Sequence, residues 1–371
     1  MLNGIAPCAI TALLLAKSTR AAPASATPSD NPLADPKYGP IPGESSLYND
    51  YVGTAPPFPA NISQPIAATT DGCPAPDDTL WQNLLSAEWI IYSFYQYGVE
   101  NFNSSSFTDL GLPNTTYTRI NEIRDNEAGH LRIFQDQISS SSVKPGACEY
   151  DFSGLVGDNP EAFLGASTLI EVSSMLFLTG LVQTAKLNAA KGALTAVSQV
   201  ETRHEVWALL DVWGEDPFGG PSDTTFPYPN EILDLTNQFV VPGSCPSVNP
   251  PFPNPSQHLP PSAVANGTAS VAPGSTVKLN FTDPDNQPQF HPGTDYFTVF
   301  YHGVNVVSYP LDTTTFPAQP IQVTIPAEFD GKGLVVMVIA TKEGAPTLDS
   351  VVTQPSLFLQ QPASLGAVFS I

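Results

Sequence analysis

The sequence predicts a multidomain α+β protein, in which a four-helix bundle is followed by a small antiparallel β-sandwich. Between about residues 80 and 213, four segments repeat apolar residues every three to four positions, the period of a helix with one buried face. The proline-rich stretch 247–262 then interrupts this pattern and is typical of a stiff linker between domains. Beyond it, apolar and polar residues alternate with a period of two, as they do in strands.

The first two helices are expected at about Thr79–Phe102 and Thr116–Ile138. Asp77 or Asp78 is a candidate N-cap for the first helix, because a side-chain oxygen at this position accepts from free backbone N–H groups. On the second helix the charged residues gather on the face opposite the apolar stripe. We expect this face to be solvated, and it comprises Arg119, Glu122, Arg124, Asp125, Arg132 and Asp136.

A connection of about twenty residues follows the second helix, whereas neighbouring antiparallel helices usually need about 2–8. A bundle whose second and third helices run parallel requires such a crossover. The third helix is expected over about residues 160–187, with Asn159 as N-cap and a proline at its first position. The fourth spans about residues 188–213 and ends at Gly214. A short helix, Asn230–Phe239, is expected to cap the bundle.

The C-terminal part is expected to contain several short strands separated by turn residues, the spacing of a small sandwich. The candidate strands are Ala269–Val271, Thr276–Phe281, Tyr296–Tyr301, Val304–Tyr309, Gln322–Ile325, Leu334–Ala340 and Leu357–Leu359. The predicted domains are a signal peptide (1–22), a Pro-rich extended arm (23–78), the bundle with its capping helix (79–246), the linker (247–262) and a β-sandwich-like domain (263–371).

Charge and the N-terminus limit the possible partners. Only 13% of residues are charged and the net charge is −22, so binding to nucleic acid or to anionic lipid is not expected. The apolar run Ile5–Ala16, followed by small residues, is typical of a secretory signal, although no Lys or Arg precedes it. This run is too short to cross a bilayer. We therefore predict a secreted protein, extracellular or in a cell wall, without a transmembrane segment.

Glycosylation and disulfide candidates agree with secretion. Asn-x-Ser/Thr sequences that fall outside the four helices occur at Asn61, Asn103, Asn114, Asn266 and Asn280. Removal of the signal peptide with Cys8 leaves three cysteines, Cys73, Cys148 and Cys245. An odd number predicts one disulfide and one free or intermolecular thiol. The spacing does not decide which two cysteines pair.

Six residues on the apolar stripes of the helices carry the candidate chemistry. In chain order they read Glu, Glu-x-x-His, Glu, Glu-x-x-His. A Glu-x-x-His pair places both side chains on one helix face, where they can bind one ion. Two such pairs and two further glutamates supply the ligands for two ions such as iron or manganese. The candidate metal ligands are Glu88, Glu127, His130, Glu171, Glu201 and His204.

Two further observations favour a metal site. Glu171 is the only charged residue between Ala162 and Ala185, and an unpaired carboxylate on a buried face is strongly unfavourable. Ligands on consecutive helices also lie at similar distances from the intervening turn, about fourteen and eleven residues for the first pair of helices. The alternative is a buried carboxylate–histidine hydrogen-bond network that holds no metal.

Tyr92 and Tyr95 lie one and two turns beyond Glu88 and are candidates for residues beside the metals, with core packing as the more ordinary role. The three remaining histidines lack a matching glutamate spacing. Solvated or structural roles are expected for His258, His291 and His302.

Four stretches resemble a known family. SAEWIIYSFY, RDNEAGHLRIFQ, STLIEVSSMLFLTG and QVETRHEVWALL are similar to the four helices of the fungal secreted ferritin-like family, whose members are known as late sexual development, stress-response and desiccation-related proteins. The resemblance covers about residues 75–246. It implies the ferritin-like fold and assigns the ligand roles to the six residues named above. One departure is that Glu88 is followed by Trp89, Ile90 and Ile91, where the family often has Glu-His-Leu-Glu.

Two functions remain as hypotheses. The first is a secreted di-metal protein that binds iron or manganese and handles peroxide, oxygen or iron in stress or sexual development. The second is a non-enzymatic glycosylated protein of a cell wall or spore coat, which contacts cell-wall components and whose bundle is metal-free. Elemental analysis of the secreted protein discriminates between them.

Overall fold

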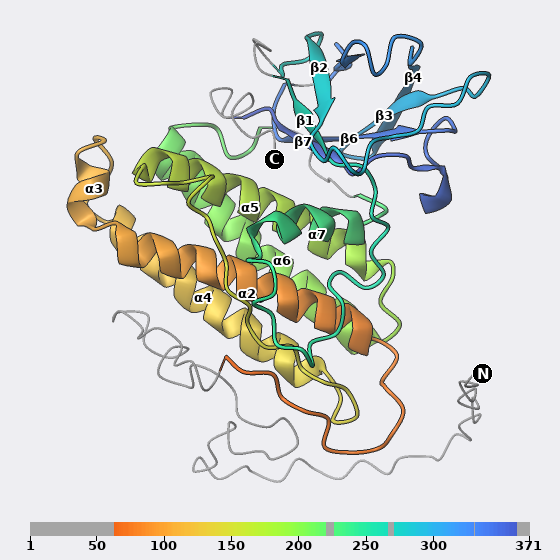
Figure 1. Ribbon diagram of the computed structural model, residues 1–371. Coiled ribbons are helices and arrows are strands. Elements are labelled where there is room, and N and C mark those ends of the chain that lie inside the picture. Colours follow the sequence, from red (N-terminus) through yellow and green to blue (C-terminus); the bar gives the residue numbers. More distant parts are fainter. Residues whose placement is uncertain (1–62, 220–225, 266–270, 330, 362–371) are drawn as a thin grey trace, which may run out of the picture.

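The computed structural model describes residues 63–219, 226–265, 271–329 and 331–361. Figure 1 shows a helical bundle beneath a β-sandwich, the α+β architecture that the sequence predicts. The predicted signal peptide, the arm up to residue 62, Asn61 and Asn266 lie outside the described residues. The helices are α2 (Asp78–Asn101), α3 (Ser104–Thr108), α4 (Thr116–Gln137), α5 (Pro160–Val182), α6 (Asn188–Trp207) with a π-helical continuation (Ala208–Trp213), and α7 (Asn230–Thr236) with a 3-10 turn (Asn237–Phe239).

The four long helices form two hairpins. α2 packs along α4, and α5 packs along α6, with the long crossover between α4 and α5 (Figure 1). α5 begins as predicted, because the Asn159 side chain accepts hydrogen bonds from the N–H groups of Glu161 and Ala162. At the end of the π-helical turn, Gly214 adopts a positive φ of 66°, which a glycine tolerates without strain.

Asp77 occupies the predicted N-cap position of α2, but the expected capping hydrogen bond from its side chain is not formed. Neither carboxylate caps α2; instead, Asp77 accepts the backbone N–H groups of Lys186 and Leu187, each at 2.8 Å. Asp78 accepts hydrogen bonds from Ser139 and Ser142 just after α4. Both aspartates are buried. The helix α5 ends at Val182 and not near residue 187, and Asp77 binds the end of the turn that follows it.

The polar face of α4 also differs from the prediction. Arg119 is exposed, but Arg124 and Asp125 are buried, at 1% and 2% exposure. An ion pair of 2.8 Å joins the Arg124 Nη2 and Asp125 Oδ1 atoms, and the guanidinium also donates to Gln96 of α2. This pairing within the protein removes much of the cost of burying two charges.

α5 is the one described helix that is long and apolar enough to cross a membrane, and 67% of its most apolar window is buried inside the protein. Its neighbours are α6 and the two helices that contact it from the other side, α2 and α7. Burial on several sides explains its nearly uninterrupted apolar sequence, since a helix that is apolar all round belongs in a core.

The β region consists of two antiparallel sheets, with strand orders β1-β2-β5 and β4-β3-β6-β7. Five of the expected strands overlap β2 to β6 within about one residue, and the last overlaps β7. The expected strand at 269–271 is not confirmed, since its described residue, Val271, lies outside any strand. One edge strand, β1, was missed because two prolines precede it. The strands are β1 (Ser262–Val264), β2 (Thr276–Phe281), β3 (Phe297–His302), β4 (Asn305–Pro310), β5 (Ile321–Thr324), β6 (Leu334–Ala340) and β7 (Ser356–Leu359).

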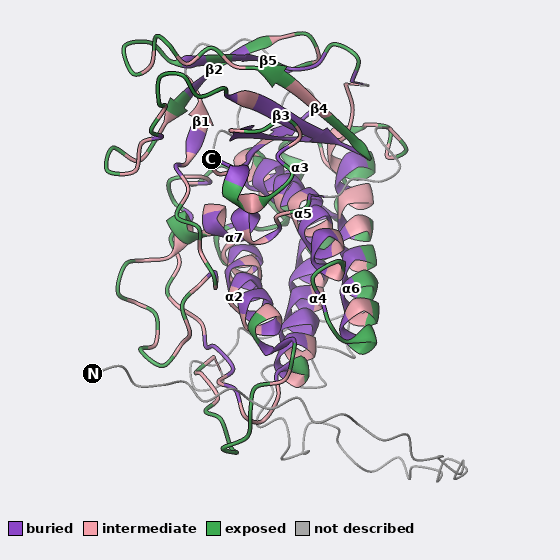
Figure 2. Cartoon of the chain, turned by 90° about the vertical axis from the view of Figure 1, so that its right-hand side faces the viewer, coloured by how far each residue is buried: buried purple, intermediate pink, exposed green. Residues whose placement is uncertain are grey.

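Strand β6 is buried along its whole length because each of its faces meets a different layer. Leu334, Val336 and Val338 join the apolar core of the helical bundle, whereas Val335 and Met337 pack toward the three-stranded sheet. Figure 2 shows the buried residues continuing from the helices into the sheet above them. The bundle and the four-stranded sheet thus share one core, and the division into separate domains stays a prediction.

The proline-rich stretch 247–262 lies against the bundle. Asn249 exchanges two hydrogen bonds with the backbone of Gly146 in the crossover. Asn254 exchanges two more with the side chain of Asn83 on α2. These paired bonds hold the stretch in place along the helices.

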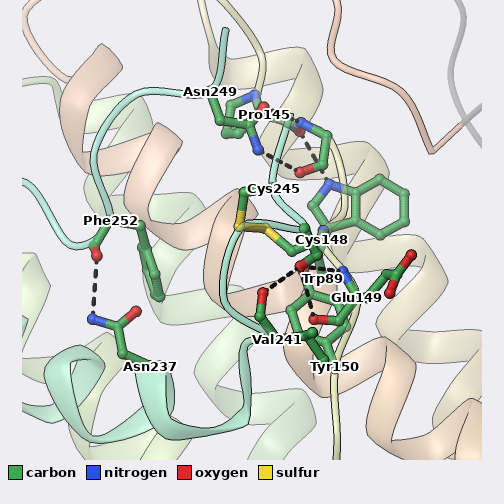
Figure 3. Close-up of a disulfide and its surroundings, with 12 residues drawn as sticks. Trp89, Pro145, Cys148, Glu149, Tyr150, Asn237, Val241, Cys245, Asn249 and Phe252 are labelled. Atoms are coloured by element: carbon green, nitrogen blue, oxygen red, sulfur yellow. Dashed lines mark hydrogen bonds between the residues drawn. A yellow bond between two sulfur atoms is a disulfide. The ribbon is translucent and has the colours of Figure 1, made fainter. Parts of the chain in front are cut away.

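A disulfide joins Cys148 in the crossover to Cys245 after α7, across a sequence separation of 97 (Figure 3). Hydrogen bonds between Glu149 and Val241 and between Glu149 and Ser244 align the same two segments. Cys73 is also disulfide-bonded, so none of the described cysteines is free, and the expected free thiol is wrong for this part of the chain.

The described glycosylation candidates, Asn103, Asn114 and Asn280, are all exposed. Asn103 caps α3 with its side chain, and Asn280 lies on β2. Their positions would admit a sugar, and glycosylation stays a prediction.

Glu231, in the first turn of α7, is a buried acid away from the candidate metal ligands. The residue is 1% exposed and neither of its carboxylate oxygens has a hydrogen-bond partner. Burial, with a smaller contribution from Asp234, raises the pKa of Glu231 to about 8. Because its ordinary pKa is 4.5, the folded protein binds a proton that the unfolded chain releases. The free energy of unfolding therefore falls as the pH rises from about 4.5 to about 8.

Replacing Glu231 by glutamine is expected to remove this part of the pH dependence. The difference in free energy of unfolding, variant minus unaltered protein, should increase by about 2–4 kcal/mol when the pH is raised from 4 to 9. Urea unfolding of both proteins at the two pH values measures the difference, with a variant of the exposed Glu149, Glu149→Gln, as control. Identical pH dependence in all three proteins would contradict a buried, protonated Glu231.

Candidate metal centre

The six candidate ligands from four different helices converge inside the bundle. Each lies on the inward face of its helix, because the 3.6-residue period keeps it in register with the apolar stripe. All six are buried, and their ligand atoms form two groups in which the atoms lie within 4.8 Å of one another. The groups are Glu88, Glu127 and His130, and Glu127, Glu171, Glu201 and His204.

His130 directs its Nδ1 atom toward three carboxylates from three helices. The distances from Nδ1 are 2.9 Å to Glu127 Oε2, 3.3 Å to Glu201 Oε1 and 3.4 Å to Glu88 Oε1. A neutral imidazole has one Nδ1 proton at most and cannot donate it well to three acceptors. His130 Nδ1 is therefore surrounded by more hydrogen-bond acceptors than its single proton can satisfy.

His204 repeats this geometry on the other half of the cluster. Its Nδ1 atom lies 3.1 Å from Glu171 Oε2, 3.3 Å from Glu127 Oε1 and 3.7 Å from Glu201 Oε2. Glu127 and Glu201 thus contribute one oxygen to each half. Glu88 contacts the histidine of the first half, and Glu171 that of the second.

When all four carboxylates of the cluster are ionised, they carry more negative charge than the two histidines can neutralise. Glu88 Oε1, Glu127 Oε1 and Glu201 Oε2 are buried without a hydrogen-bond partner. Within the described residues, the two histidines are the only basic side chains within 4 Å of these carboxylates. Buried carboxylates are stable when they are paired or bind metal, so these residues could hold a metal ion.

The pKa values of the cluster are shifted by burial and by mutual charge. Burial raises the pKa of Glu88 and of Glu201 well above the ordinary value, and repulsion by Glu127 raises both further. Burial alone would lower the pKa of both histidines, but attraction to the carboxylates outweighs it and raises them. Burial likewise opposes ionisation of Glu127, yet the two histidines lower its pKa. Without metal the cluster therefore retains protons, and metal binding has to release them.

Of the two candidate tyrosines, Tyr95 reaches the cluster. Its hydroxyl donates a hydrogen bond to Glu171 Oε1 and lies 2.9 Å from the hydroxyl of Ser167. Tyr95 is fully buried, and burial together with the Glu171 charge raises its pKa well above the ordinary value. Tyr92 packs edge-on against Trp89.

The sequence analysis did not identify Asn126 as a residue of the site. Its Oδ1 atom lies 3.3 Å from His204 Nε2. A proton on Nε2 that is donated to Asn126 leaves the Nδ1 lone pair of His204 free to bind a cation. Its position next to Glu127 was the one available signal, but adjacent helical residues point in different directions, so the sequence does not indicate this contact.

The remaining histidines have other surroundings. His302 is buried, and its Nδ1 atom lies 3.0 Å from the backbone oxygen of Leu334 on the neighbouring strand. His258 and His291 are exposed. Structural and solvated roles, as expected from the sequence, agree with these positions.

Comparison with known proteins agrees with this geometry. Residues 77–210 match the model of the family described as "Ferritin-like domain". The matched region contains α2, α4, α5 and α6 and all six residues of the cluster. A search of curated proteins found no match. Residues 77–210 thus have a helical, ferritin-like fold, and antiparallel sheets follow them in the chain.

Proposed function

We propose that this protein is a secreted di-metal protein that binds two iron or manganese ions in its ferritin-like domain and handles peroxide, oxygen or iron. One observation carries the proposal: each histidine Nδ1 faces carboxylate oxygens from three different residues, and Glu127 and Glu201 direct one oxygen to each histidine. A single proton per histidine cannot satisfy these oxygens, whereas one cation beside each histidine can.

The geometry suggests a distinct role for each ligand. Glu127 and Glu201 direct one oxygen to each half and would bridge the two ions. Glu88 and His130 would complete the ligand set of one ion, and Glu171 and His204 that of the other. When bound, the metal pair supplies the change of oxidation state that peroxide or oxygen chemistry needs.

The surrounding residues hold the ligands in position. Tyr95 donates to the Glu171 oxygen that does not face His204, and so orients this carboxylate. Asn126 favours the His204 tautomer with a free Nδ1. The bundle core keeps bulk water from the carboxylates, since all six ligands are buried.

Secretion is part of the proposal and has three supports. These are the apolar run near the N-terminus, the exposed Asn-x-Ser/Thr sites and the Cys148–Cys245 disulfide, a bond typical of oxidising compartments. The resemblance to fungal secreted ferritin-like proteins suggests a role in stress or sexual development. A structural role in a cell wall or spore coat is the competing proposal, in which the carboxylates and histidines only share protons.

The decisive experiment is elemental analysis of protein secreted by its host and purified without chelators. We expect about two equivalents of iron or manganese per chain. Removing the metal with a chelator should lower the melting temperature, and restoring it should reverse the loss, because a ligand that binds only the folded state stabilises it.

Loaded protein should then consume hydrogen peroxide, or oxidise added iron(II) in air, faster than the metal-free protein. Protein that stays below about 0.2 equivalents after incubation with iron(II) and manganese(II) would support the structural alternative and reject a di-metal site.

A further inference from the structure

An apolar pocket of about 100 Å³ lies between α2 and α5. Helix α7 contacts both helices (Figure 1), and its residues contribute to the lining of the pocket. Its walls are almost entirely apolar, with Leu84 and Phe94 from α2, Ala166 and Leu178 from α5 and Ile232 from α7 among them.

Two residues of the candidate metal centre line this pocket. Glu88 and Glu201 are the two charged residues among those that line it. Ser173 of α5 also lines the pocket, and its hydroxyl oxygen is buried without a hydrogen-bond partner. A molecule in the pocket would therefore lie among apolar side chains and beside these two cluster residues.

The opposite face of the bundle offers a different surface. Between α4 and α6 a groove of about 400 Å³ is lined by apolar residues such as Ile133 and Val197 together with four polar ones, Asp125, Asn126, His130 and Arg203. Water and ions can form hydrogen bonds with these polar side chains, but they would lose hydrogen bonds in the apolar pocket. The cluster is thus bordered by a groove of mixed polar and apolar lining on the α4–α6 side and by an almost wholly apolar pocket on the α2–α5 side.

The size of the pocket selects a class of ligand. An apolar cavity of roughly 150 Å³ in another protein remains dry and binds benzene or xenon. With about 100 Å³ and an incompletely closed outer side, this pocket suits a small uncharged apolar molecule. Burying its surface would provide the main driving force for binding.

We propose that the α2–α5 pocket binds a small uncharged apolar molecule and places it against Glu88 and Glu201. If the proposed function is correct, this molecule is a substrate of the di-metal site or the route by which an apolar reactant arrives. Binding itself requires no metal, so it can be tested on metal-free protein.

The test uses xenon and benzene as probes. Crystals of the metal-free protein under xenon pressure should show xenon in the α2–α5 pocket. In solution, benzene should raise the melting temperature of the unaltered protein. Ala166→Leu, which fills the pocket from α5, should reduce this rise at least fivefold. Ala162→Leu, one turn earlier on the same helix and away from the pocket lining, should keep it.

Absence of xenon from the pocket, or an undiminished benzene effect in folded Ala166→Leu protein, overturns the proposal. If Ala166→Leu does not fold, the xenon experiment on the unaltered protein decides the matter alone. Elemental analysis of the same preparations separates the two proposals. Two bound ions without xenon in the pocket reject the apolar site alone, and xenon in a protein that binds no metal rejects the proposed function alone.

Discussion

Replacing Glu201 by glutamine is expected to remove both ions of the proposed di-metal site, whereas replacing Glu88 by glutamine should remove only one. Glu201 directs Oε1 toward His130 and Oε2 toward His204, so each half of the cluster depends on it. Glu88 contacts His130 and no second histidine. A glutamine side chain has the same shape but lacks the charge, and a neutral amide is a poorer ligand for iron or manganese than a carboxylate.

Metal content per chain provides the measurement. It should fall from about two equivalents to below about 0.3 for Glu201→Gln and to about one for Glu88→Gln. Glu127→Gln should behave like Glu201→Gln, because Glu127 also faces both histidines.

Glu205→Gln is the matched control, since Glu205 lies one turn further along α6 and outside the two groups of ligand atoms. Its burial raises its pKa to about 7, so the control also removes a partly buried acid. Equal metal loss in the Glu88 and Glu201 variants would contradict the bridging role. Full metal content in Glu201→Gln would contradict the di-metal site altogether.

Removing the Cys148–Cys245 disulfide is expected to destabilise the protein by about 2–5 kcal/mol. The bond closes a segment with a sequence separation of 97, which includes α5, α6 and α7. In the chain-entropy view, a cross-link over a loop of roughly 100 residues restricts the unfolded chain strongly, by about 4.7 kcal/mol. The hydrogen bonds between Glu149 and Val241 remain in the folded variant, so its fold should persist.

Urea unfolding of the double variant Cys148→Ser with Cys245→Ser measures this loss. The variant should unfold at a lower urea concentration, and any change in the slope of the transition reports a change in the unfolded state. Ser244→Ala is the control: it removes the hydroxyl that accepts from Glu149 N–H and donates to Val241, and should cost only about 1 kcal/mol. A double variant no less stable than this control would show that the disulfide adds little.

The helices and the candidate ligands were predictable because their signal is local. Apolar spacing located α2, α4, α5 and α6 to within a few residues, apart from the late end predicted for α5. The same spacing placed Glu88, Glu127, Glu171 and Glu201 on buried faces, where the structure finds them. A helix fixes the direction of each side chain relative to its neighbours in the chain, so a pattern of one helix already indicates which residues face inward.

Contacts between distant segments were not predictable in this way. Only the tertiary structure shows that Glu88 contacts His130 while Glu171 contacts His204, and that Tyr95 donates a hydrogen bond to Glu171. It also shows that the Asp77 carboxylate, which was expected to cap α2, accepts hydrogen bonds from the backbone of the α5–α6 turn.

The same division holds beyond the metal centre. Alternation and turn residues indicated most of the strands, but only the folded chain shows that β6 is covered on both faces, by the bundle and by the second sheet. Burial of Arg124 with Asp125 and the choice of Cys245 as the partner of Cys148 belong to the same class. Periodicity records which side of an element is apolar. Which element covers that side depends on the packing of the whole chain, to which residues far apart in the sequence contribute jointly.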